Sequence, residues 1–287
     1  MTDTYVTSVT KYIDAEGIRY AYRRFGRETG VPLILFQNFR QGMDNVDPLL
    51  LNGFARDRPV ILFDNAGVAS SSGETPDTIE AMADQAATFV GALKLTELDV
   101  LGFSIGGYSA QAFVLRHPHL VRRLMLVGTA PRAQEPRTDP RVDQVVSRPA
   151  LGFGLEEYLF LLFTPSQASQ ATGRDAWDRQ QAAWEQRRQR GLDIDPPTSP
   201  QTAKAQYAAI LEWRQAKGER FAELKSIKQP TLVVNGSNDI MVPTINSWIL
   251  AQNIPNAQLI VYPDAGHGAH FQYPELFLQH SRLFLDA

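Results

Sequence analysis

The chain has 287 residues, of which 44% are hydrophobic and 21% are charged, a balance typical of a folded globular protein. Its net charge of −3 gives no electrostatic reason to expect nucleic acid or an anionic membrane as a partner. The absence of cysteine excludes disulfides, thiol nucleophiles and thiolate metal sites. No apolar stretch approaches the roughly 20 residues of a membrane span, and no signal-peptide pattern opens the chain, so we expect a cytoplasmic protein.

The order of the predicted elements indicates an α/β protein. Alternation over residues 5–13 and 18–22, on either side of Asp14-Ala15-Glu16-Gly17, predicts an opening β-hairpin. Short and almost uninterrupted apolar runs suit parallel strands covered on both faces, and they occur at residues 32–36, 60–63, 98–103, 124–127, 231–234 and 258–262. Helical patterns between them cover residues 78–93, with Asp77 or Thr78 as cap, and residues 104–117, which end at Pro118. This alternation predicts a doubly wound, mostly parallel sheet of eight strands.

The strand rhythm stops after Arg132 and resumes at Gln229. Residues 133–221 are rich in Gln, Arg, Ala and Trp, with prolines at the joints, and residues 167–190 and 202–215 have helical patterns. We therefore expect one core, formed by residues 1–132 and 222–287, that is interrupted after its sixth strand by a helical insertion at residues 133–221.

A nucleophile motif lies between a predicted strand and a predicted helix. The pentapeptide Gly102-Phe103-Ser104-Ile105-Gly106 has the pattern G-x-S-x-G of a nucleophile elbow. Because such a turn is sharp and strains the serine backbone, its neighbours must be small. On its own, the pentapeptide is also compatible, as the less favoured reading, with a glycine-containing turn whose serine only caps the helix. In this context we expect Ser104 to be a nucleophile.

A serine hydroxyl needs a base, and the base needs a carboxylate to orient it. His267 and His270 both lie in the glycine-containing loop after the predicted strand at residues 258–262. We take His267 as the base because glycines flank it on both sides, and we interpret His270 as a helix-start or pocket-wall residue. Asp239 follows the predicted strand at residues 231–234; alone it would be a turn residue. Each of the three residues follows a strand, in the order Ser, Asp, His, so we predict a triad of Ser104, Asp239 and His267.

These motifs together resemble the α/β-hydrolase superfamily over nearly the whole chain. Residues 63–73 are similar to the family's D-x-x-G-x-G-x-S loop after its fourth strand, with Gly67 at the first glycine and Ala69 at the second. The resemblance implies that residues 133–221 form the family's helical cap, or lid. We expect three cap residues, Phe163, Trp177 and Trp184, to line a substrate pocket.

The loop after the third strand departs from the family pattern. Gln37 and Asn38 stand where the family has His-Gly. By the same resemblance, the backbone N–H groups of Phe39 and Ile105 form the oxyanion hole, although the Phe39 ring can also be read as a pocket wall. Backbone donors require no particular side chain, so the departure does not remove this function.

The resemblance implies a serine hydrolase that acts on a small-molecule carboxylic ester or lactone through an acyl-enzyme on Ser104, without a cofactor or metal. A serine nucleophile disfavours the family branches that use an aspartate at this position. The same triad also serves cofactor-free perhydrolases (haloperoxidase-like) and carbon–carbon bond hydrolases. A non-catalytic ligand-binding receptor on a hydrolase scaffold is an alternative of another class. The sequence leaves the substrate and the oligomeric state open.

Overall fold

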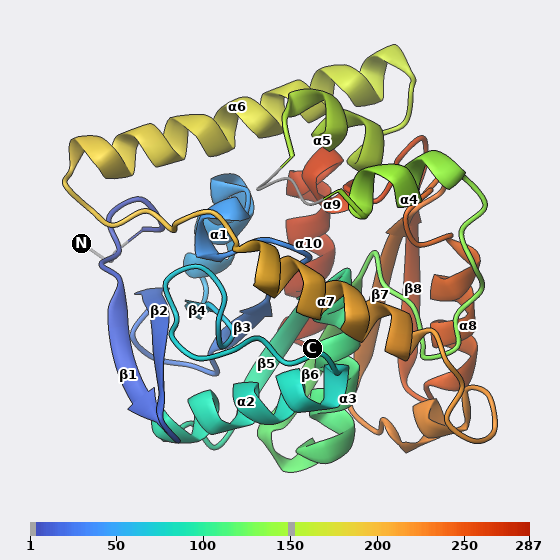
Figure 1. Ribbon diagram of the computed structural model, residues 1–287, viewed down its shortest axis with the longest axis horizontal. Helices are drawn as coiled ribbons and strands as arrows, with labels where there is room; N and C mark the ends of the chain where they lie inside the picture. The colour runs from blue at the N-terminus through green and yellow to red at the C-terminus, as the bar shows by residue number, and fades with distance from the viewer. Residues whose placement is uncertain (1–3, 149–152) are drawn as a thin grey trace.

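An eight-stranded sheet forms the centre of the protein (Figure 1). The computed structural model describes residues 4–148 and 153–287. The strand order is β1-β2-β4-β3-β5-β6-β7-β8; β2 is antiparallel to both β1 and β4, and the remaining neighbours are parallel. The strands are β1 (Lys11–Ala15), β2 (Ile18–Gly26), β3 (Leu33–Phe36), β4 (Pro59–Phe63), β5 (Leu98–Phe103), β6 (Val121–Val127), β7 (Thr231–Gly236) and β8 (Ala257–Tyr262). The predicted fold class is confirmed.

Helices flank the sheet, which explains why its central strands are apolar on both faces. Every residue of β3, β4 and β5 is buried. The helices of the core are α1 (Pro48–Ala55), α2 (Ile79–Ala92), α3 (Ile105–Arg116), α8 (Ile245–Asn253), α9 (Ala269–Gln272) and α10 (Pro274–Leu285), with short 3-10 helices η1 (Met43–Asn45), η2 (Pro118–Leu120) and η3 (Ala222–Ser226). Thr78 caps α2 by accepting a hydrogen bond from the N–H of Ala81. None of the described helices is long and apolar enough to cross a membrane.

The first strand begins later than its pattern predicts. Strand β1 begins at Lys11, whereas residues 5–7 form a turn. Tyr5 is fully buried there, and its hydroxyl donates a hydrogen bond of 2.8 Å to Asp44 Oδ1. The prediction of a strand from residue 5 is wrong, because Tyr5 lies in a turn outside the sheet. Its ring is buried there, and its hydroxyl is hydrogen-bonded to Asp44. The hairpin itself is present, and positive φ angles at Glu16 and Gly17 suit its two-residue turn.

In the described part of the segment predicted as an insertion, four α-helices lie between β6 and β7. They are α4 (Pro140–Val146), α5 (Leu155–Leu162), α6 (Gln167–Gln189) and α7 (Pro200–Trp213). Helices α6 and α7 match the helical patterns at residues 167–190 and 202–215, whereas α4 and α5 carried no clear sequence pattern. Figure 1 shows α6 as the long yellow helix along the top of the view. Residues 1–3 and 149–152 of the predicted core and insertion lie outside the described residues.

A buried ionic cluster joins the insertion to the core. Arg23 on β2 donates to both carboxylate oxygens of Asp44, at 2.5 and 3.0 Å. Asp44 and Asp195 each accept a backbone N–H hydrogen bond from the other, at 2.7 and 3.0 Å. Burial opposes ionisation of Asp44, but the hydrogen bonds and charge of Arg23 hold the pKa of this carboxyl below its ordinary value. Arg23 and Asp44 are therefore both charged inside the protein, and each of the two charges is stabilised by the other.

Replacement of Asp44 by Asn should strongly destabilise the fold. The variant leaves the fully buried Arg23 without its carboxylate, and breaking a buried ion pair costs about 3–5 kcal/mol. Asp57→Asn is the matched control, because Asp57 pairs with Arg282 at the surface, where an ion pair contributes about 1 kcal/mol or less. Urea unfolding of the two variants measures the difference. Equal stability of Asp44→Asn and wild type would contradict the assignment of charge to this cluster.

Candidate active site

Ser104 stands in a strained turn between β5 and α3. Its backbone angles are φ 57° and ψ −122°, a conformation that non-glycine residues rarely adopt. A Cβ on Gly106 would lie 2.1 Å from the carbonyl oxygen of Phe36, and one on Gly102 would lie 2.5 Å from that of Gly106. The two glycines of the motif are therefore required by close backbone contacts. This geometry is that of a nucleophile elbow, a sharp turn that exposes the serine side chain at the end of the strand.

The structure brings Asp239 and His267 together behind the cavity that Ser104 lines. Asp239 follows β7 and His267 follows β8, so both side chains come from the carboxyl edge of the sheet. His267 Nδ1 and Asp239 Oδ2 are 2.7 Å apart, and both side chains are buried. The other oxygen of Asp239 accepts hydrogen bonds from the backbone N–H groups of Met241 and Val242, at 2.8 and 2.9 Å. Both oxygens of the Asp239 carboxylate are thus held by hydrogen bonds, and the carboxylate in turn orients the imidazole of His267.

The second nitrogen of His267 is available for proton transfer. His267 Nε2 is buried and has no hydrogen-bond partner among the described residues. It lies with Ser104 on one cavity, here named the nucleophile cavity, which encloses about 370 Å³. The nucleophile cavity is lined by Asn38, Phe39, Gln41, Ser104, Phe153, Tyr158, Leu161, Leu162, Met241 and His267. A base oriented by a carboxylate and a serine therefore share one space, as proton transfer between them requires.

The loop that carries Phe39 is held in place by the insertion. The N–H of Arg40 donates a hydrogen bond of 2.8 Å to Gln206 Oε1 on α7, and Thr198 Oγ1 donates one of 2.9 Å to the carbonyl oxygen of Arg40. Arg40 has a positive φ of 60°. Gln206 and Thr198 thus act as positioning residues for the segment next to Phe39. Sequence reasoning missed both. Gln206 is a polar residue in a helical pattern, which usually indicates an exposed face, and Thr198 lies in the segment between α6 and α7, which carried no pattern.

Three further spaces adjoin the nucleophile cavity. A vestibule of about 1010 Å³, partly open to solvent, shares Gln41, Phe153 and Tyr158 with it, and Trp177 and Trp184 are among its walls. A side arm of about 360 Å³ shares Phe39, Ser104 and Met241 with it. The other side-arm residues are Ile105, Tyr108, Arg137, Val146, Ile210, Arg214 and Val242. The third space, an aromatic chamber, shares only Asn38 and Gln41.

The predicted pocket residues of the insertion separate into two groups. Trp177 and Trp184 line the vestibule, and Trp184 Nε1 also donates a hydrogen bond of 2.5 Å to the carbonyl oxygen of Asp44. Phe163 is buried elsewhere: its ring lies against Gly173 and 5.5 Å from the ring of Tyr158, and it lines none of the four spaces. Phe163 therefore packs α5 against α6.

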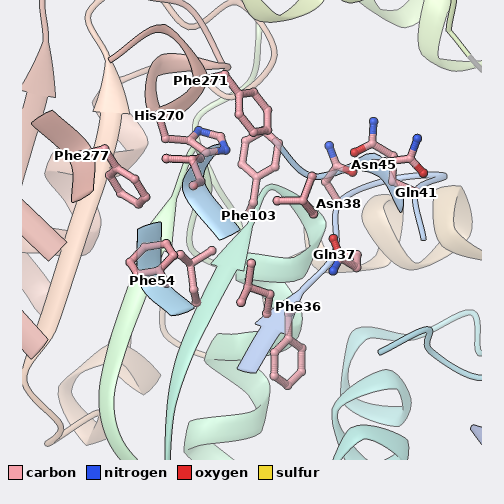
Figure 2. Close-up of a pocket in the computed structure, with 14 residues that line it drawn as sticks. Phe36, Gln37, Asn38, Gln41, Asn45, Phe54, Phe103, His270, Phe271 and Phe277 are labelled. Atoms are coloured by element: carbon pink, nitrogen blue, oxygen red, sulfur yellow. The ribbon is translucent and has the colours of Figure 1, made fainter. Parts of the chain in front are cut away.

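His270 lines the aromatic chamber and is paired with no carboxylate of the described residues. Its ring centroid is 4.4 Å from that of Phe103 and 3.9 Å from that of Phe271. Figure 2 shows His270, Phe54 and Phe277 on one side of this chamber, with the amide side chains of Asn38, Gln41 and Asn45 on the other. Burial, and then the charge of His267, lower the pKa of His270 to about 3. His270 therefore stays neutral, in the position of a wall residue.

Among the described residues, no group of three or more His, Asp or Glu side chains could hold a metal ion. The site as described consists of a serine and an imidazole on one cavity, a carboxylate hydrogen-bonded to the imidazole, and Phe39 and Ile105 on the walls beside the serine.

Comparison with known proteins gives matches over most of the chain. The model of a family described as the alpha/beta hydrolase fold matches residues 31–274. An alpha/beta hydrolase fold protein from Chitinophaga pinensis is 38% identical, with a TM-score of 0.89 and coverage of 99% of this chain and 100% of that one. A poly(3-hydroxyalkanoate) depolymerase from Ectopseudomonas oleovorans is 29% identical over 90% of this chain and 85% of its own. A 2-hydroxymuconate semialdehyde hydrolase from Pseudomonas sp. (strain CF600) is 26% identical over 94% and 91%. The named substrates differ.

His267→Gln should abolish activity, whereas His270→Gln should retain most of the activity. At acidic pH, His270→Gln should also be more resistant to unfolding than wild type. Unfolded histidine binds a proton below pH ~6.5, but folded His270 resists protonation down to about pH 3. Wild-type stability therefore falls as pH decreases through this window. Between pH 7 and pH 5 the unfolding free energy of His270→Gln should rise by about 2 kcal/mol relative to wild type. Urea unfolding at both pH values, with a turnover assay at pH 7, tests this; a pH-independent difference would contradict it.

Proposed function

Because this chain belongs to the α/β-hydrolase family of enzymes, we propose that it hydrolyses a small carboxylic ester or lactone through an acyl-enzyme on Ser104. The observation that supports this most strongly is the 2.7 Å contact between His267 Nδ1 and Asp239 Oδ2. It leaves His267 Nε2 as a buried nitrogen without a partner among the described residues, on the cavity that Ser104 lines.

The reaction has two halves that use the same base. Ser104 Oγ attacks the acyl carbon while His267 Nε2 takes the hydroxyl proton, and Asp239 stabilises the resulting imidazolium. The bond from the acyl carbon to the alcohol oxygen then breaks, and the alcohol leaves with the proton from His267. Water next gives a proton to His267 and adds to the acyl carbon. Return of that proton to Ser104 releases the carboxylic acid and restores the enzyme.

The oxyanion of each half-reaction would be held by the backbone N–H groups of Phe39 and Ile105. Both residues line the side arm next to Ser104, and Ile105 is the first residue of α3, where the helix dipole favours negative charge. Two such donors typically contribute several kcal/mol to transition-state stabilisation. The hydrogen bonds that Gln206 and Thr198 make with Arg40 would keep the Phe39 donor in place.

Residues 133–221 would act as the lid over this site. Helix α5 gives Tyr158, Leu161 and Leu162 to the nucleophile cavity, and α6 gives Trp177 and Trp184 to the vestibule. Tyr158, Leu161 and Leu162 share the nucleophile cavity with Ser104 and form a largely apolar wall there, which suits an acyl or alcohol group of low polarity. The buried contacts of Arg187 with the carbonyl oxygens of Tyr5 and Ser8, at 2.9 Å, hold α6 to the core. We therefore expect lid movement to leave the end of α6 docked.

Ser104→Ala should fold normally and lose activity by about four or more orders of magnitude, because the attacking oxygen is removed. Wild type should react with one equivalent of a fluorophosphonate probe at Ser104, and the variant should not. Ser109→Ala, on the next turn of α3, is the matched control and should label like wild type. Labelling of Ser104→Ala would show that another residue is the nucleophile. A wild-type protein that resists labelling and cleaves no ester would be a receptor.

Trp177→Ala and Trp184→Ala should change substrate preference without disabling the triad. Enlarging the vestibule alters how apolar groups of different length are held, so the ratio of kcat/KM for long and short acyl esters should change by about tenfold. A series of p-nitrophenyl esters and lactones measures this, with a peracid assay to detect perhydrolase chemistry. Trp248→Ala, an exposed tryptophan on α8, is the control. A uniform change on every substrate, with probe labelling retained, would contradict a role in specificity.

A further inference from the structure

We propose that the side arm of the active site binds a carboxylate group of the substrate, held by Arg214. This inference rests on the proposed function and specifies its substrate class. The side arm is lined by Ser104 and by both proposed oxyanion residues. A substrate group bound in the arm is therefore only a few bonds from the carbon that Ser104 attacks. Two arginines, Arg137 and Arg214, line the same arm. An ester hydrolase for wholly neutral substrates has no need of a cation there.

The two arginines differ in how their charge is balanced. Arg137 donates to Asp143 Oδ1 from Nε, at 3.0 Å, and from Nη2, so a carboxylate already neutralises it. Arg214 follows α7 and is half-buried. Its guanidinium makes no hydrogen bond or ion pair with another described residue. Asp239, whose charge also acts on Tyr108 in the arm wall, is occupied by His267 and two backbone N–H groups. Arg214 therefore has no carboxylate of its own in this part of the structure.

The positive charges of both Arg137 and Arg214 act on a residue in the wall of the side arm. Tyr108 is a wall residue whose hydroxyl donates a hydrogen bond of 2.7 Å to Gln134. Burial raises the pKa of Tyr108 to about 12, and the charges of Arg214 and Arg137 work against this rise. Both guanidinium groups are thus close enough to influence a buried oxygen in the arm wall. They would stabilise a substrate carboxylate in the same space.

The chemistry of the remaining walls limits the group to a short acid. Val146, Ile210, Met241 and Val242 are apolar, so the stem that carries the carboxylate would be hydrocarbon. The guanidinium presents a planar fork of N–H donors that matches a carboxylate with two parallel hydrogen bonds. Ser104 also lines the nucleophile cavity, whose walls include the apolar residues Phe153, Leu161 and Leu162. The substrate class is therefore an ester or lactone with a free acid on one side of the scissile bond and an apolar group on the other.

Two matched substrate pairs test this on either side of the ester. One pair is 4-carboxyphenyl and 4-carbamoylphenyl butyrate, and the other is monomethyl glutarate and methyl glutaramate; each pair exchanges a carboxylate for a neutral amide. In at least one pair wild type should prefer the carboxylate. Arg214→Gln should lower kcat/KM for that member by about 10- to 100-fold, the usual weight of a hydrogen bond to a charged group, and leave the amide within about threefold.

Two further variants separate charge from structure. Arg214→Lys should recover part of the preference, because it keeps the charge and loses the fork. Arg174→Gln removes an exposed arginine of α6 that lines none of the four spaces, and it should behave like wild type. The carboxylate preference should also weaken with added salt. Calorimetric titration of Ser104→Ala with the preferred ester, with and without Arg214→Gln, measures binding independently of turnover.

The outcomes distinguish this inference from the proposed function. Hydrolysis of neutral esters without a carboxylate preference in either pair would overturn the carboxylate site and leave the serine hydrolase intact. Equal losses on both members in Arg214→Gln, or a preference that survives it, would also overturn the site. Failure of every ester, together with failure of probe labelling, would overturn the proposed function itself. Carboxylate-dependent binding to Ser104→Ala that is lost in Arg214→Gln supports the site.

Discussion

The backbone conformation of Ser104 is the constraint on which the rest of the site depends. A positive φ in a non-glycine residue costs roughly 1–3 kcal/mol, and it persists only where the surroundings fix it. Here the fixing contact is the approach of Gly106 to the carbonyl oxygens of Phe36 and Gln37, which leaves no room for a Cβ. The same contact sets the distance between the elbow and the loop that carries Phe39. One glycine therefore positions the nucleophile and the proposed oxyanion donors together.

A second glycine contact connects the acid and the base. A Cβ on Gly236, at the end of β7, would lie 2.2 Å from the carbonyl oxygen of Ala265, in the loop before His267. The loop of Asp239 and the loop of His267 can therefore approach closely enough for a 2.7 Å contact. The insertion adds to this packing, since the N–H of Gly268 donates a hydrogen bond of 2.7 Å to the carbonyl oxygen of Leu162 at the end of α5. The end of α5 and the loop that carries His267 are thus directly connected.

Sequence reasoning located what local patterns encode and missed what depends on tertiary contacts. Ser104, Asp239 and His267 were identifiable because each follows an apolar run, and parallel strands place their carboxyl ends at one edge. The choice of His267 over His270 also came from flanking glycines, which leave a recognisable pattern. No pattern distinguished Trp184, which lines the vestibule, from Phe163, which packs two helices together. That distinction depends on how α5 and α6 pack.

The polar residues of the insertion were the least predictable. Arg and Gln in a helical pattern usually indicate a solvent-exposed face, and residues 179–190 have that composition. Arg187 is nevertheless fully buried, and Gln206 holds the segment next to Phe39. The pattern also gave no reason to place Arg214 on the active-site wall. Each of these positions follows from where the insertion meets the core, which a local sequence window does not contain.

The buried ionic cluster explains how the insertion finds that position. A cluster of charges is a poor source of stability, because removing ions from water costs about as much as their attraction returns. It is, however, selective, because the charges are satisfied in one arrangement. A Cβ on Gly42 would lie 2.6 Å from Asp195 Oδ2 and 2.9 Å from Asp64 Oδ1, so carboxylates from core and insertion converge on the backbone of one loop. Burial, and then the charge of Asp195, raise the pKa of Asp64.

The loop at this convergence also borders the catalytic space. Gln41 precedes Gly42 and is a wall of the nucleophile cavity, the vestibule and the aromatic chamber alike. Any displacement of the insertion from Asp44 would therefore move the boundary between these spaces. Apolar residues of similar volume could hold the insertion as firmly, but they would tolerate sliding along the contact, which hydrogen-bonded charges do not. We infer that the charges fix the register of the insertion, and through Gln41 the shape of the space in front of Ser104.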